Sequence, residues 1–83
     1  MNLNGNSLLN SIPSEIEYLE NLRVLEFHDT NITELPIEIL KLNKLEEIYG
    51  TFEFVYSSKI AKKLGEKGVN VISHRFETGR KNT

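Results

Sequence analysis

The chain has 83 residues, which suits one small domain, and it contains no cysteine, so disulfide bonds and cysteine chemistry are excluded. A net charge of −2 at pH 7 is too small to predict a nucleic-acid or membrane partner. No apolar run is long enough to span a bilayer, and the first residues do not have the pattern of a signal peptide. We therefore expect a cytoplasmic protein that makes no membrane contact.

Apolar residues repeat at an interval of 23 along the first half of the chain. The pairs at this interval are Ile12 and Leu35, Pro13 and Pro36, Ile16 and Ile39, Leu19 and Leu42, Leu22 and Leu45, and Leu25 and Ile48. A period of this length is typical of stacked repeats that bury their apolar faces against one another. A single amphipathic helix over residues 14–25 is the alternative, but it does not explain why a proline recurs at the same interval.

Each repeat is expected to start with a short strand. In the second unit Leu25 and Phe27 occupy alternate positions, so both side chains should point into the core. Asn6 and Thr30 follow the strands, where a short polar side chain can bond to the turning backbone. The first unit has one more residue than the second between this position and its proline, which a turn tolerates.

The return segments follow the two prolines. Ser14 and Glu17 have the spacing of a capping box, which predicts a short helical turn after Pro13. The second unit has Ile37 at the position of Ser14 and lacks this cap. We therefore expect its return segment to be looser or 3₁₀-like.

These motifs resemble the leucine-rich repeat. Residues 1–50 follow the pattern L-x-x-L-x-L-x-x-N/T-x-L-x-x-L/I-P-x-x-I-x-x-L, and residues 22–48 fit it at nearly every apolar position. Thr30 followed by Leu35 and Pro36 is similar to repeats of immune-receptor type and of many bacterial leucine-rich repeat proteins, whereas residues 11–16 are similar to repeats of plant receptors. The resemblance implies an α/β fold, namely a right-handed solenoid with a short parallel β-sheet on its concave face. It also implies binding of a protein partner through that face.

The third unit departs from the repeat pattern, because bulky aromatic residues replace its consensus positions. Residues 58–68 predict a helix that Ser57 or Ser58 caps at its start. Residues 69–73 predict a strand that keeps the 23-residue interval at Val71. Together these elements predict a C-terminal helix–strand cap over the end of the repeats.

The chain is accordingly divided into three parts. Residues 1–50 hold the leucine-rich repeats, about two units and a third strand, residues 51–76 form the C-terminal capping unit, and residues 77–83 are expected to form a flexible tail. The first strand shows no comparable cap, so its edge is expected to be exposed and open to self-association. This arrangement also suits a fragment of a longer repeat array.

The outward positions of the sheet are the expected partner-binding surface. Strand alternation predicts two ladders, one of Asn2, Glu26, Tyr49 and Ile72 and one of Asn4, His28, Thr51 and His74. Tyrosine is favoured at binding hot spots, so Tyr49 is the expected anchor. The candidate partner-binding residues are Val24, Glu26, His28, Asp29, Glu47, Tyr49, Thr51, Asn70, Ile72 and His74. A solvated sheet face without a partner is the alternative.

Catalysis and metal binding receive little support from the sequence. His28 and His74 are expected to lie about 9.6 Å apart, which is two strand spacings and too far to share a metal ion. The lysines of residues 59–67 suit a solvated helix face better than contacts to an RNA backbone. We expect no catalytic, cofactor or metal site and no nucleic-acid partner. The identity of the protein partner stays open.

Two other functions are left open. In the first, the chain is the structural, capped C-terminal end of a larger leucine-rich repeat protein, immune-receptor-like or bacterial, whose recognition surface lies upstream. In the second, which is weaker, the repeats deliver a substrate to a catalytic partner domain.

Overall fold

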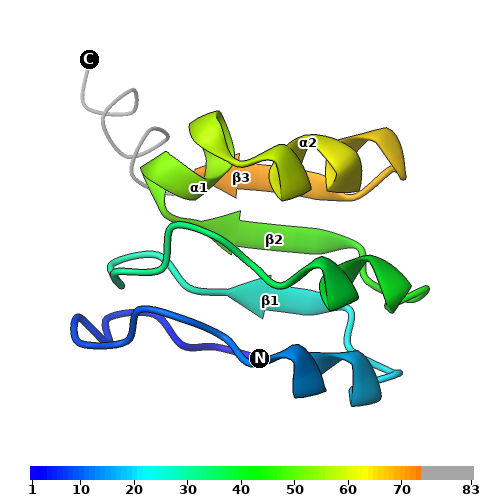
Figure 1. Cartoon of the computed structure of the whole chain (residues 1–83), viewed down its shortest axis with the longest axis horizontal. Coiled ribbons are helices and arrows are strands. Elements are labelled where there is room, and N and C mark those ends of the chain that lie inside the picture. The colour runs from blue at the N-terminus through cyan, green and yellow to red at the C-terminus, as the bar shows by residue number, and fades with distance from the viewer. Residues whose placement is uncertain (74–83) are drawn as a thin grey trace.

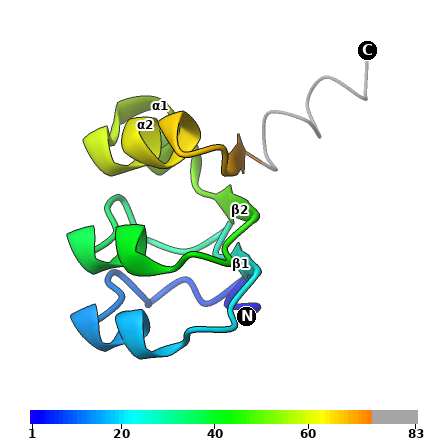
Figure 2. The ribbon, with the colours of Figure 1, turned by 90° about the vertical axis from the view of Figure 1, so that its right-hand side faces the viewer.

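Three parallel strands form one sheet in the order β1–β2–β3 in the computed structural model, which describes residues 1–73 (Figure 1). The strands are β1 (Val24–Glu26), β2 (Glu47–Gly50) and β3 (Asn70–Ser73). The 3₁₀ segments η1 (Ser14–Tyr18) and η2 (Ile37–Lys41) precede β1 and β2, and the helices α1 (Phe52–Ser57) and α2 (Lys59–Glu66) precede β3. Figure 2 shows the strands along one side of the molecule and the helical segments along the other. The chain therefore has an α/β fold.

The register of the sheet follows the interval found in the sequence. Leu25 pairs with Ile48, and Ile48 pairs with Val71. Beside β1, Asn2 forms a parallel bridge with Glu26, so the interval there is one residue longer. The extra residue lies in the turn of the first unit, where it lengthens the loop without moving the strands.

The hydrophobic core lies between the sheet and the return segments. Its side chains with 0% exposure are Leu25, Phe27, Ile32, Ile39, Ile48 and Phe54. Burying one such side chain stabilises the fold by about 1.5–3 kcal/mol. Leu25 and Phe27 both point inward, as the strand pattern predicts.

Polar side chains close the turn after the bridge at Asn2 and the turn after β1. The side-chain amide of Asn6 donates to the carbonyl of Leu3 at 2.7 Å. The hydroxyl of Thr30 donates to the carbonyl of Phe27 at 2.7 Å. The same hydroxyl accepts a bond from the N–H of Ile32 at 3.2 Å. The predicted roles of Asn6 and Thr30 are therefore confirmed.

Both return segments are 3₁₀ turns, so the capping box predicted at Ser14 is wrong. Pro13 holds the position before η1, and no side-chain bond caps that end. Glu17 instead accepts a hydrogen bond from Lys41 of the next unit at 3.0 Å, so its carboxylate serves the contact between units. This bond raises the pKa of Lys41 above its usual value of 10.5. The 3₁₀-like form expected for the second unit is confirmed by η2.

The structure differs from the sequence analysis after β2. Helix α1 was not predicted, and the side chain of Thr51 is buried although it was expected to face outward. Thr51 is 9% exposed. Its hydroxyl accepts the N–H of Phe54 at 3.1 Å and donates to the carbonyl of Ile32 at 2.7 Å. It therefore caps α1 instead of facing outward, which corrects its place among the partner-binding candidates. The predicted cap at Ser58 is confirmed, because its hydroxyl accepts the N–H of Ala61 at the start of α2.

Gly50 lies against two buried aromatic rings. A Cβ at this position would lie 2.9 Å from Cζ of Phe27 and 3.1 Å from Cδ2 of Phe54. Since both rings are held in the core, Gly50→Ala should lower the free energy of unfolding by about 1–3 kcal/mol, measured by urea denaturation. Gly65→Ala is the matched control, because a Cβ on this α2 residue meets no atom within 4 Å and alanine favours helix. Equal midpoints for the two variants would contradict the expectation.

Candidate functional site

The outward side of the sheet carries a set of candidates that we call the sheet face, namely Val24, Glu26, Glu47, Tyr49, Asn70 and Ile72. Strand alternation places them opposite the inward Leu25 and Ile48. The register aligns them in two rows, one of Val24, Glu47 and Asn70 and one of Glu26, Tyr49 and Ile72. Neighbours within a row are about 4.8 Å apart. A partner can therefore contact residues of three strands at once.

Both carboxylates of the sheet face accept hydrogen bonds. The hydroxyl of Tyr49 donates to Glu47 at 3.3 Å, and the side-chain amide of Asn4 donates to Glu26 at 2.9 Å. These bonds orient the two acids and the tyrosine ring. No member of the set is a lysine or arginine, so the sheet face combines negative charge with the apolar area of its aliphatic side chains.

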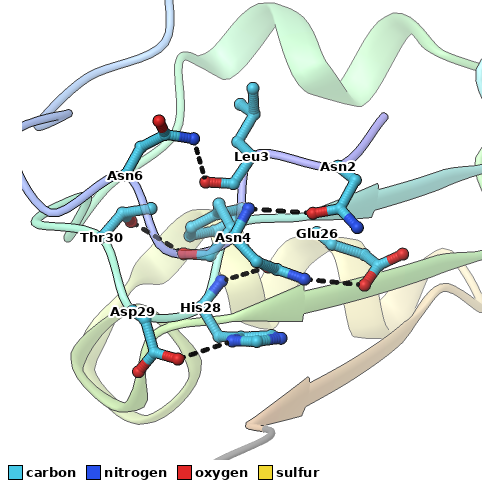
Figure 3. Close-up of polar contacts among 9 residues, drawn as sticks. Asn2, Leu3, Asn4, Asn6, Glu26, His28, Asp29 and Thr30 are labelled. Carbon is cyan, nitrogen blue, oxygen red and sulfur yellow. Dashed lines mark hydrogen bonds and ion pairs between the residues drawn. The ribbon is translucent and has the colours of Figure 1, made fainter.

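Asn4 links the first unit to the end of β1, as Figure 3 shows. Its side-chain oxygen accepts the backbone N–H of His28 at 2.9 Å, while its side-chain nitrogen donates to Glu26. The backbone N–H of Asn4 donates to the side-chain oxygen of Asn2 at 3.0 Å. Sequence reasoning placed Asn4 beside His28 but missed these bonds. Their signal is the alternation of asparagine at positions 2, 4 and 6.

His28 and Asp29 lie in the turn after β1 and not within the strand. Nδ1 of His28 is 3.1 Å from Oδ2 of Asp29, and the Asp29 side chain is 76% exposed. Asp29 has a φ of 60°, a left-handed conformation that aspartate tolerates better than most residues. The turn thus extends the negative charge of the sheet face past the end of β1.

Two candidates do not join this surface. Thr51 is buried at the start of α1, and His74 lies outside the described residues. The predicted ladder of Asn4, His28, Thr51 and His74 is therefore wrong at Thr51, because the chain turns into α1 directly after Gly50. The other ladder is confirmed by the pairing of Asn2, Glu26, Tyr49 and Ile72.

A small cleft lies where β1 and β2 end. Its volume is about 80 Å³, and it is lined by His28, Asp29, Thr30, Gly50, Thr51, Phe52 and Glu53. This cleft is smaller than the 300–1,000 Å³ that is typical of small-molecule sites. Within residues 1–73, no three histidine or acidic side chains are placed to hold a metal ion together. No helix in this part of the chain is long and apolar enough to cross a membrane.

Part of the chain is similar to TMV resistance protein N of Nicotiana glutinosa. The two sequences are 47% identical over 45 residues. The matched segment is 54% of this chain and 4% of that protein, so the chain spans a small fraction of the relative's length. No family model matches the chain, and no solved structure matches it.

Proposed function

We propose that this chain is a leucine-rich repeat module, a short right-handed solenoid that binds a protein partner through the sheet face. The observation that carries the proposal is the row of Glu26, Tyr49 and Ile72 across three parallel strands. A tyrosine in the middle of such a row offers a rigid apolar ring together with a hydroxyl that forms hydrogen bonds. These are the properties of residues that dominate binding energy at protein interfaces.

Two features support the repeat assignment. The 23-residue interval of the sequence is kept in the strand register from Leu25 through Ile48 to Val71. The similarity to TMV resistance protein N agrees with the resemblance of residues 30–36 to repeats of immune-receptor type. We therefore assign residues 1–50 to the repeats and residues 51–76 to the C-terminal capping unit. Residues 74–76 of that unit and the expected tail at residues 77–83 lie outside the described residues.

In this proposal the module acts by contact alone and catalyses no reaction. The ring of Tyr49 packs against the partner, and Glu26 and Glu47 accept hydrogen bonds from it. Negative charge favours a partner whose contacting surface carries lysine or arginine. Charges of this kind mainly raise the association rate, whereas loss of the packed ring mainly raises the dissociation rate.

Tyr49→Ala should weaken partner binding by at least about thirtyfold, as expected for a hot spot worth about 2 kcal/mol. The test is a pull-down from an extract of the source cells, followed by affinity measurement with the recovered protein. Tyr18→Ala is the matched control, because Tyr18 is 71% exposed but lies on η1, on the other side of the molecule. Retention of the same partner by both variants with equal affinity would refute binding through the sheet face.

A structural role is the second candidate, because the apolar side chains of the first unit are more exposed to solvent than those of the second. Leu19 is 41% exposed, whereas Leu42, at the same repeat position, is 4% exposed. This difference suits a chain that caps the end of a longer repeat array. If capping were the whole function, the extract would yield no protein whose capture depends on Tyr49.

A further inference from the structure

The turn of the first unit contains an asparagine–glycine pair, Asn4 and Gly5, and no other asparagine of the chain is followed directly by glycine. Asparagine is among the thermolabile residues. The backbone nitrogen of the next residue can attack its side-chain carbonyl carbon, and glycine leaves that nitrogen accessible because it has no Cβ. The pair is therefore the position of this chain at which a side-chain amide is lost most readily.

The loss of this amide needs water as its co-reactant and no oxidant. The backbone nitrogen of Gly5 gives up its proton and forms a bond to Cγ of Asn4, while the bond from Cγ to Nδ2 breaks and Nδ2 leaves as ammonia. The succinimide ring that results takes up one water molecule. Cleavage of its new bond leaves aspartate, and cleavage of the original peptide bond leaves isoaspartate, in which the backbone runs through the side chain.

Hydrogen bonds to the second unit hold both reacting groups. The N–H of Gly5 donates to the carbonyl of His28 at 3.1 Å. The side-chain oxygen of Asn4 accepts the N–H of His28 at 2.9 Å, and its Nδ2 donates to Glu26 at 2.9 Å (Figure 3). The attack needs a free backbone nitrogen and a side chain that can rotate, so these bonds have to break first. In the native chain the reaction therefore depends on local opening of the first unit.

Neither product fits the place that Asn4 occupies. Aspartate has no side-chain N–H to donate to Glu26, so its carboxylate would face Oε1 of Glu26 across the 2.9 Å that the present bond spans. Two carboxylates at that separation repel each other unless one of them is protonated. Isoaspartate adds a methylene carbon to the backbone between Leu3 and Gly5, whose N–H groups bond to the carbonyls of Glu26 and His28. Either product therefore weakens the contact between the two units.

We propose that Asn4 is a site of spontaneous deamidation, which the fold protects while the first unit is bonded to the second, and that the product keeps the first unit from bonding again. Because ammonia leaves, the reaction does not reverse, and deamidated chains accumulate with each opening. The product also places a second negative charge beside Glu26. The proposal rests on the bonds between the two units and not on partner binding, so it does not depend on the proposed function.

Peptide mapping by mass spectrometry of the full chain tests the protection. After incubation at neutral pH, Asn4 should deamidate at least about tenfold faster in denaturing urea than in the native chain, because the native bonds prevent the attack. Hydrogen exchange at the Gly5 amide breaks one of the same bonds, so the fold should slow exchange there by a similar factor. Equal rates of deamidation in the two states, or no deamidation of Asn4 in urea, would overturn the proposal.

Variants test the effect of the product. Asn4→Asp should speed hydrogen exchange at the amides of Leu3 and Gly5 at least about tenfold, because its carboxylate faces Glu26. Adding Glu26→Gln should restore slow exchange, since the new amide can donate to the new carboxylate. Asn43→Asp, which adds the same charge at an exposed residue of the turn before β2, is the matched control and should leave both amides unchanged. Unchanged exchange in Asn4→Asp, or no recovery with Glu26→Gln, would refute the proposed effect of the product.

Discussion

Phe27→Ala is expected to lower the free energy of unfolding by about 3–5 kcal/mol, the usual effect of removing a buried aromatic ring. Phe27 has 0% exposure, and its ring centroid lies 5.3 Å from that of Phe54 in an edge-to-face arrangement. A domain of this size has a total stability of roughly 4–12 kcal/mol. The variant should therefore be largely unfolded at 37 °C, as circular dichroism and urea denaturation would show.

Phe52→Ala is the matched control for this prediction. Phe52 is 48% exposed on α1 and contacts Tyr56 with a centroid distance of 4.7 Å. Its removal leaves no closed cavity, so the expected loss is about 1 kcal/mol or less. If Phe27→Ala cost no more than Phe52→Ala, the ring pair of Phe27 and Phe54 would not be the centre of the core.

Thr51→Val should cost about 2–4 kcal/mol although it keeps the shape of the side chain. The hydroxyl of Thr51 caps α1 through Phe54 and also donates to the carbonyl of Ile32. Valine removes the cap, worth about 1 kcal/mol, and leaves a buried carbonyl without its donor, which costs about 1–3 kcal/mol. Urea denaturation at constant pH measures the loss.

Thr51→Ser keeps the hydroxyl and loses one methyl group, so it should cost about 1 kcal/mol or less. The pair of variants therefore separates the hydrogen bonds of Thr51 from its packing. Equal losses for valine and serine would show that the two bonds contribute nothing measurable. A loss of partner binding without a loss of stability would instead return Thr51 to the contact surface.

The strand register could be predicted from the sequence because aliphatic residues recur at one interval. Leu25, Ile48 and Val71 are 23 residues apart, and the three pair in register across the sheet. A period of two within each strand then separates inward from outward positions. For this reason the outward positions of the strands were predicted correctly wherever the chain is a regular strand.

The main error of the sequence analysis lies where the chain departs from the repeat pattern after β2. The 23-residue interval predicted an outward side chain at Thr51, although β2 ends at Gly50 and α1 begins at Phe52. The spacing of Thr51 and Phe54 is that of a helix cap, a local signal that the repeat pattern masked. Glu17 was misassigned for a related reason, because its hydrogen-bonding partner belongs to the next unit.

By itself the sequence determined the α/β class, the inward core, the ladder from Asn2 to Ile72 and the cap at Ser58, since these depend on short-range periodicity and local hydrogen bonds. Only the tertiary structure decided the burial of Thr51 and the bonds of Asn4. These features arise from contacts between units that are about 20 or more residues apart. The spacing of residues within one unit does not determine which side chains of the next unit they contact.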